Sequence, residues 1–257
     1  MGHRSARARA VRRKMINVAR AVVAPSAYAF NPPLVEPLTS EAVEEAGYCS
    51  QLGQDLLIDR HVFAGRREGF FVDVGAHDGV TWNNTVFFER ERGWSGLCIE
   101  PNPNVFPRLE SARSAECVRA AIGPDDTSVP FRVVTGYAEM LSGIETAYDR
   151  RHRARLERER AEFGGDTHIV RVPMRRLDTV LRDAGINRVD LLSIDVEGGE
   201  SGVLDSIDLR TFHVAAVIIE NHFHKWSIAR RFRRQGYQLM LRLGWDELYM
   251  PNPARLG

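Results

Sequence analysis

Five short apolar runs, separated by helical stretches, constrain the fold of this chain more than any other feature. Continuous apolar runs of about four to eight residues are typical of strands buried on both faces, as in parallel sheets covered by helices. Strands that alternate with helices predict an α/β fold with one mostly parallel sheet. The predicted strands are residues 69–74, 96–100, 117–122, 189–195 and 214–220.

The remaining elements complete this pattern. Two apolar runs at the end of the chain predict an antiparallel hairpin, and two short helices are expected before the first strand. The predicted helices are residues 41–46, 51–63, 80–92, 102–113, 176–184, 200–207 and 226–235, and the hairpin strands are 237–243 and 247–250.

A charge-rich segment interrupts the alternation. Residues 145–163 hold six arginines and five acidic residues, and an apolar residue recurs on one helical face. This spacing predicts a helix laid across the loop end of the sheet, within a lid insertion of about residues 138–165. A solvated charged linker is the alternative interpretation.

The charge distribution separates the N-terminus from the rest. The first 24 residues carry seven basic residues and no acid. Without these seven, 28 basic residues face 34 acidic ones, so the remainder carries about −6, which argues against nucleic-acid binding. We expect a basic arm and linker over residues 1–37 and one domain over residues 38–257. The arm is interpreted as a frayed terminus, a dimer arm or a lipid anchor, so a homodimer stays open.

Two features of the sequence, its apolar runs and its cysteines, bear on the location of the protein. No apolar run approaches the roughly 20 residues that span a bilayer, so no transmembrane segment is expected. The three cysteines, Cys49, Cys98 and Cys117, are far apart and form no CxxC motif. This argues against a disulfide framework or a thiolate zinc site and favours a reducing, cytoplasmic location.

Acids end four of the predicted strands at the edge where parallel sheets bind ligands. The run Phe71–Gly79 (FVDVGAHDG) has glycines spaced G-x-x-x-G, which does not match the dinucleotide pattern G-x-G-x-x-G. Asp73 beside this loop would repel a pyrophosphate and suits a cationic ligand. Glu100, at the end of the next strand, is placed to accept both hydroxyls of a ribose. A ribose and a cation together point to S-adenosylmethionine rather than NAD.

The chain resembles the FkbM family of methyltransferases in several motifs. They are SQLGQD (50–55), FFVDVGAHDGVTWNNT (70–85), GLCIEPNP (96–103), MRRLDTVL (174–181) and LLSIDVEGGE (191–200). The resemblance covers roughly residues 48–249 and implies a Rossmann-like class I methyltransferase fold. That fold has a mostly parallel seven-stranded sheet with a C-terminal antiparallel hairpin. Gly199 stands where the family usually has a histidine after VEG.

The resemblance also implies which residues bind the cofactor. Glu100 takes the ribose hydroxyls, and the segment from Met140 to Gly143 covers the methionine end. The upstream SQLGQD motif is similar to one that closes over the site. The implied cofactor-binding residues are Gln51, Gln54, Asp73, Gly75, Ala76, Glu100, Pro101, Asn102, Ala121 and Ser142.

Polar residues after the fourth and fifth strands predict the acceptor side. Asp195, Glu220 and Asn221 offer oxygen ligands that suit Mg²⁺, or Mn²⁺ by the same hard-ligand preference. A metal there would bind the acceptor hydroxyl and lower its pKa. Asp195, Glu197 and His222 are the candidate catalytic residues, because a carboxylate or an imidazole can act as a general base. The alternative is that Glu220 and Asn221 cap the next helix.

The predicted activity is S-adenosylmethionine-dependent O-methylation of a hydroxyl on a sugar or oligosaccharide, with Mg²⁺-assisted deprotonation. The leading alternative is a metal-independent O-methyltransferase of a polyketide or other small molecule with a histidine or glutamate base. Methylation of nitrogen or carboxylate, a nonenzymatic binding module and an NAD-dependent oxidoreductase fit the residues less well.

Overall fold

The computed structural model describes residues 34–255. The predicted basic arm therefore lies outside the described residues except for its last four, of which Leu34 and Val35 form a short strand, β1. Within the described ranges, no helix is both long enough and apolar enough to cross a bilayer.

The main sheet has eight strands in the order β1-β11-β12-β10-β9-β2-β3-β4. The core of the sheet is parallel, and β12 runs antiparallel to both β10 and β11. The predicted α/β sheet with a C-terminal hairpin is confirmed, with one difference: β1 adds an eighth strand beside β11. The strands are β2 (Phe70–Val74), β3 (Ser95–Ile99), β4 (Glu116–Val118), β9 (Leu191–Ile194), β10 (Ala216–Glu220), β11 (Tyr237–Leu243) and β12 (Asp246–Pro251).

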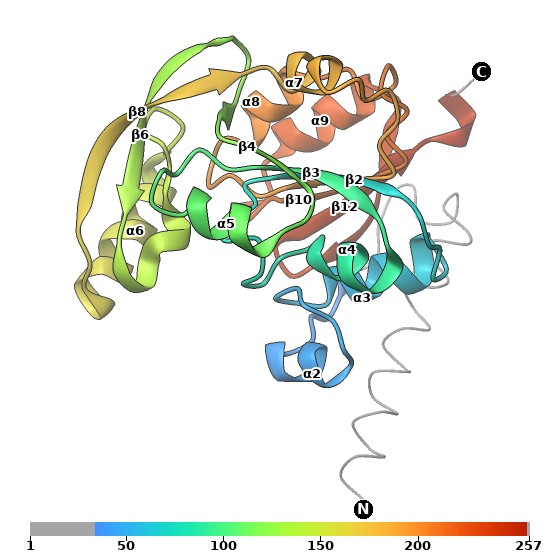
Figure 1. Ribbon diagram of the computed structural model, residues 1–257, viewed down its shortest axis with the longest axis horizontal. Helices are drawn as coiled ribbons and strands as arrows, with labels where there is room; N and C mark the ends of the chain where they lie inside the picture. The colour runs from blue at the N-terminus through green and yellow to red at the C-terminus, as the bar shows by residue number, and fades with distance from the viewer. Residues whose placement is uncertain (1–33, 256–257) are drawn as a thin grey trace, which may run out of the picture.

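Helices cover both faces of this sheet (Figure 1). Side chains alternate along the strands, so Phe71 packs in the core under one helical layer and Val72 in the core under the other. The first layer contains α3 (Gln54–Leu57), the π-helical turn η2 (Ile58–Val62), α4 (Val86–Arg92) and α5 (Phe106–Ala112), with α2 (Ser40–Glu45) beside it. The second contains α7 (Leu177–Asp183), α8 (Glu200–Asp205) and α9 (Trp226–Arg234).

A second, four-stranded sheet carries the predicted insertion, with strand order β5-β8-β6-β7. Its strands β6 and β8 pair antiparallel from Thr127↔Met174 to Val134↔Thr167, and the charged helix α6 lies at their end (Figure 1). The elements are β5 (Ala121–Ile122), β6 (Thr127–Val134), the 3₁₀ turn η3 (Gly136–Leu141), β7 (Gly143–Ile144), α6 (Arg150–Phe163) and β8 (Thr167–Arg175). The structure therefore shows a helix over most of residues 145–163, together with a sheet that the sequence did not predict.

Three of the elements differ from the predicted bounds for a local reason that the structure shows. The strand expected over 117–122 is divided between the two sheets, because the chain leaves the edge of the main sheet after Val118. The helix expected from residue 80 begins at Val86, since the side chain of Asn83 accepts hydrogen bonds from the backbone N–H groups of Thr85 and Val86. The helix expected from residue 102 begins at Phe106, next to a proline in its first turn.

Candidate active site

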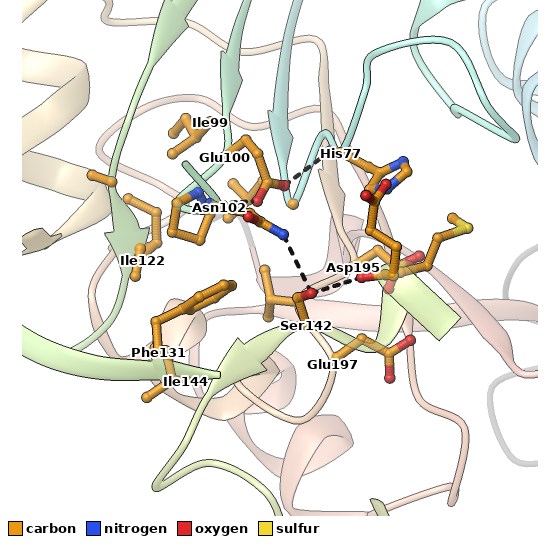
Figure 2. Close-up of a pocket in the computed structure, with 18 residues that line it drawn as sticks. His77, Ile99, Glu100, Asn102, Ile122, Phe131, Ser142, Ile144, Asp195 and Glu197 are labelled. Carbon is orange, nitrogen blue, oxygen red and sulfur yellow. Dashed lines mark hydrogen bonds and ion pairs between the residues drawn. The ribbon is translucent and has the colours of Figure 1, made fainter. Parts of the chain in front are cut away.

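A pocket opens where the carboxyl ends of β2, β3 and β9 face the second sheet. Its free volume is about 670 Å³, part of which is open to solvent. The main sheet contributes residues that follow its strands, including Gly75, Glu100 and Asp195, and the second sheet contributes apolar side chains (Figure 2). These apolar wall residues are Ala121, Ile122, Phe131 and Ile144. The pocket therefore combines a polar floor with a wall that suits a flat apolar ring.

Glu100 is buried in this pocket and is fixed by the backbone. Its Oε2 accepts a hydrogen bond from the backbone N–H of His77 at 3.0 Å, and its Oε1 accepts one from the N–H of Asn102 at 2.8 Å. Burial raises the pKa of Glu100 from its ordinary value, and these two hydrogen bonds oppose the rise. Each oxygen keeps a further lone pair, so the carboxylate can still accept hydroxyl donors.

The loop after β2 turns sharply for an internal reason. Gly75 has φ +86°, and a Cβ there would lie 1.7 Å from the backbone oxygen of Asp195. Gly79 likewise packs against the side chains of Leu109 and Arg113. The structure thus shows that both glycines make room for the protein itself.

Asp73 lies under this loop and does not line the pocket. Its Oδ2 accepts hydrogen bonds from Asn83 Nδ2 and Thr85 Oγ1, both at 2.8 Å, and Arg113 lies 3.9 Å away. Burial raises the pKa of Asp73, while Arg113 and the hydrogen bonds oppose the rise. The carboxylate therefore holds the loop in place from behind. Ala76 is buried and also lies outside the pocket lining.

The other predicted cofactor residues fall into two groups. Pro101, Asn102, Ala121 and Ser142 line the pocket. Asn102 Nδ2 donates to Ser142 Oγ at 3.3 Å, which joins the two sheets across the pocket (Figure 2).

Gln51 and Gln54, in contrast, do not line it. Gln54 is buried and its Nε2 donates to Asp246 Oδ2 at 2.6 Å, so this motif supports the acceptor side of the sheet edge.

Three carboxylates converge at the predicted acceptor side. Asp195 and Glu197 follow β9, Glu220 ends β10, and each offers an oxygen within 4.8 Å of the other two. Glu197 has φ +48°, a left-handed conformation that non-glycine residues rarely adopt and that is common in functional sites. The structure thus brings together two of the predicted metal ligands, Asp195 and Glu220, with the candidate catalytic residue Glu197.

The crowding of these carboxylates shifts their proton affinities. Asp195 keeps more than a third of its surface accessible, but that surface faces a pocket that protein surrounds on several sides. Loss of solvation, and then repulsion from Glu220, raises the pKa of Asp195 well above its usual range. Burial and Glu220 do the same to the pKa of Glu197, which Arg155 opposes.

Arg155 comes from the insertion helix α6. Its Nη1 lies 3.3 Å from Glu197 Oε2, and its Nε pairs with Glu159 at 3.1 Å. Asp149, at the N-cap of the same helix, pairs with Lys225 Nζ at 3.0 Å. The helix is therefore held by ion pairs to segments that follow both β9 and β10.

Asn221 and His222 lie near the three acids but differ from expectation in their contacts. Asn221 Oδ1 accepts a hydrogen bond from the N–H of Lys225 at 2.7 Å, and its Nδ2 donates to Glu247 at 3.0 Å. Its amide oxygen is thus already engaged by the backbone just before α9. His222 Nδ1 lies 3.7 Å from Glu220 Oε1, and its ring packs against Trp245. Neither residue lines the pocket.

Sequence reasoning missed three contributors to this site. Asp246 stands opposite Glu220 in the antiparallel pair β10–β12, and burial with the Glu220 charge raises its pKa to about 8. Glu200 begins α8, and burial raises its pKa to about 7. Arg155 is one of many charged residues on α6. Asp246 ends the hairpin turn at the same sheet edge, and that position was the signal available in the sequence.

Known proteins share this arrangement of motifs. The model of the methyltransferase FkbM domain matches residues 73–239. A curated relative, Methyltransferase 1 of Beauveria bassiana (strain ARSEF 2860), is 29% identical over 156 residues, which are 55% of this chain and 59% of the relative. The chain thus spans less than two thirds of that relative's length.

Two solved structures have distant similarity to the fold. A methyltransferase FkbM from Methylobacillus flagellatus KT aligns with 72% of this chain and 44% of its own, at 16% identity and a TM-score of 0.44. A TehB-like SAM-dependent methyltransferase from Corynebacterium glutamicum ATCC 13032 Kitasato aligns with 82% of this chain and 94% of its own, at 12% identity and a TM-score of 0.42. The assignment rests on the family model, which covers nearly two thirds of the sequence: this chain belongs to the FkbM methyltransferase family.

Proposed function

We propose that this protein is an S-adenosylmethionine-dependent O-methyltransferase that acts on a hydroxyl of a sugar or oligosaccharide, with Mg²⁺-assisted deprotonation. The observation that carries the proposal is the position of the Asp195, Glu197 and Glu220 carboxylates beside a pocket whose opposite end holds Glu100. One pocket thus offers a group for a ribose and a group for deprotonation.

Two features of the pocket support S-adenosylmethionine as the methyl donor. Glu100 is fixed by two backbone N–H groups and keeps lone pairs for ribose hydroxyls. The apolar side chains Ile122, Phe131 and Ile144 suit an adenine ring. When bound, S-adenosylmethionine would supply an electrophilic methyl group on a sulfonium sulfur.

The chain's own residues position the reaction. The Gly75 turn and the Asp73–Arg113 contacts fix the pocket floor, so donor and acceptor can be held in line without reorganisation. Asp195 or Glu197 would take the proton of the acceptor hydroxyl, since their raised pKa values make each a stronger base than an ordinary carboxylate. Helix α6 would cover the acceptor and exclude water, as the predicted lid.

The three carboxylates at this end suit a divalent cation as well as a proton. Asp195, Glu197 and Glu220 offer hard oxygen ligands, the type that Mg²⁺ and Mn²⁺ prefer. A bound Mg²⁺ would lower the pKa of a hydroxyl that it contacts. Glu197 replaces Asn221 in the proposed ligand set, because the amide oxygen of Asn221 is engaged by Lys225.

The second candidate is a metal-independent O-methyltransferase of a polyketide or other small-molecule hydroxyl. The ion pair between Arg155 and Glu197 favours it, because a guanidinium already offsets part of the charge that a metal would neutralise. In this mechanism Glu197 or His222 acts as the general base.

The test is methyl transfer from labelled S-adenosylmethionine to a panel of saccharides and polyketide aglycones, with and without EDTA. The proposal expects product from a saccharide, activity at least tenfold lower after EDTA treatment, and recovery with Mg²⁺. Full activity after EDTA treatment would exclude the metal and leave the second candidate. Both candidate functions would be overturned if NAD raised the melting temperature of the protein and S-adenosylmethionine did not.

A further inference from the structure

Two of the three cysteines stand side by side on neighbouring strands. Cys98 of β3 and Cys117 of β4 are direct partners in the parallel register of the main sheet. Residues paired in this way point to the same face, and both side chains pack in the core under α3, α4 and α5. Both are free thiols, and the Cys117 thiol donates a hydrogen bond to the backbone oxygen of Ala115 at 3.5 Å.

The spacing of the pair is compatible with a covalent link. Neighbouring strands lie about 4.8 Å apart, and disulfides span Cα separations of roughly 4.4–6.8 Å. Cys98 is fully buried, whereas Cys117 lies on the edge strand β4 and is partly exposed. A small oxidant can therefore reach one thiol of the pair from solvent.

The surroundings make the two thiols unequal. The neighbouring Cys98 thiol lowers the pKa of Cys117, burial opposes this, and the Arg113 guanidinium lowers it further. The neighbouring Cys117 thiol and burial raise the pKa of Cys98. Cys49 is different, since burial and the Asp55 charge raise the pKa of its thiol. Cys117 is thus the expected nucleophile, because the thiolate is the reactive form.

We propose that Cys98 and Cys117 form an oxidant-sensitive dithiol that hydrogen peroxide converts into an internal disulfide between β3 and β4. The Cys117 thiolate attacks peroxide, the O–O bond breaks, and a sulfenic acid and hydroxide form. The Cys98 sulfur then attacks the sulfenic sulfur, the S–O bond breaks, and the Cys98 proton leaves with the oxygen as water. Overall, two thiols and one hydrogen peroxide give one disulfide and two waters.

The pair lies close to the pocket. Glu100 follows Cys98 by two residues, and its backbone N–H donates to the oxygen of Val118, the residue after Cys117, at 3.1 Å. Ala120 and Ala121, which follow β4, line the pocket. A disulfide would reorient the two side chains beneath these strand ends, and we expect this repacking to shift Glu100. This step rests on the proposed function, and it predicts that oxidation weakens cofactor binding at least fivefold, reversibly with dithiothreitol.

The experiment oxidises the reduced full chain with hydrogen peroxide, blocks the remaining thiols and maps the peptides by mass spectrometry. The expected result is a peptide pair linked through Cys98 and Cys117, with Cys49 alkylated and in no disulfide. Phenylarsine oxide should also bind the reduced protein at one equivalent, because trivalent arsenic forms two As–S bonds with a close dithiol and releases one water. Oxidation of Cys117 to a sulfinic acid without a linked peptide would overturn the proposal.

Variants separate the pair from the lone thiol. Cys117→Ser should abolish both the linked peptide and the arsenical binding, and Cys49→Ser should change neither. Cys98→Ala tests the buried partner, and thermal melting shows whether this variant folds. S-Adenosylhomocysteine binding is measured before and after oxidation. A linked peptide with unchanged binding would overturn the coupling to the pocket, whereas no binding to the reduced protein would count against the proposed function alone.

Discussion

The two ends of the pocket differ in how their charges are satisfied. At the Glu100 end, each carboxylate oxygen accepts a backbone N–H, and Asp73 beneath it is held by Asn83, Thr85 and Arg113. At the other end, the Asp195, Glu197 and Glu220 carboxylates crowd together, and Arg155 contacts just one of them, Glu197. The first end is preorganised for a constant ligand, and the second carries a charge imbalance that a proton, a cation or a substrate can relieve.

The largest expected effect tests the acceptor end alone. Asp195→Asn should lower turnover by about 10²–10⁴-fold, the usual contribution of a general base, while S-adenosylmethionine affinity changes by less than threefold. Single-turnover rates and calorimetry measure the two quantities. The matched control is Asp208→Asn, which changes an exposed acid that does not line the pocket. An equal loss of donor affinity would show that the two ends are not separable.

The next effect concerns stability and pH at the same end. Asp246 has a pKa of about 8 in the folded protein against an ordinary 3.8, so the native state holds a proton that the unfolded chain has lost. Stability from this group is present below about pH 4 and is lost as the pH rises towards 8.

Asp246→Asn removes that loss. The free energy of unfolding of the variant, relative to wild type, should increase by on the order of 3 kcal/mol between pH 5 and pH 8. Urea titrations at both pH values measure it, with exposed Asp125→Asn as the control. A difference that does not change with pH would mean that Asp246 is ionised in the fold.

A smaller effect tests the opposite end. Glu100→Ala should weaken S-adenosylmethionine binding by about 1.5–3 kcal/mol, the range for charge-assisted hydrogen bonds. The loop amides of His77 and Asn102 lose their acceptor too, so thermal melting must accompany the calorimetry. Glu110→Ala, on the exposed side of α5, is the control. Unchanged affinity would remove Glu100 from the ribose role.

The smallest effect concerns the helix over the acceptor end. Arg155→Gln removes a partly exposed ion pair worth about 0.5–1 kcal/mol, so amide hydrogen exchange across Arg150–Phe163 should become about two- to fivefold faster. Arg158→Gln, an exposed arginine on the same helix, should leave exchange unchanged. If donor and acceptor together do not slow exchange in the wild type, α6 is not a lid.

The sequence predicted the preorganised end better than the crowded end, and the reason is the distance between contributing residues. Gly75, Glu100 and Asn102 belong to one strand–helix–strand unit, β2-α4-β3, so their motifs already specify their neighbourhood. Asp246 and Arg155 reach Glu220 and Glu197 from a hairpin and an insertion, and only the folded chain shows these contacts.

The second sheet was missed for a different reason. Pro130 lies within β6 and Pro173 within β8, and proline argues against a strand in sequence reasoning. The buried parallel strands contain no proline, so their apolar runs were sufficient. The roles of the predicted site residues stay predictions, although the structure already gives Gly75 a structural reason that the sequence could not provide.

Residues 136–165 leave and rejoin the second sheet at one point, and this bears on how freely their length can vary. Thr135 and Asp166 meet at that point, because the N–H of Thr135 donates to the oxygen of Asp166 at 3.0 Å and the N–H of Asp166 donates to Thr135 Oγ1 at 3.0 Å. Gly165 fits there because a Cβ would lie 2.2 Å from the oxygen of Thr135. A segment that enters and leaves at one point can change in length at little entropic expense to the remaining fold. The length of residues 136–165 can thus change while the main sheet keeps its part of the pocket floor.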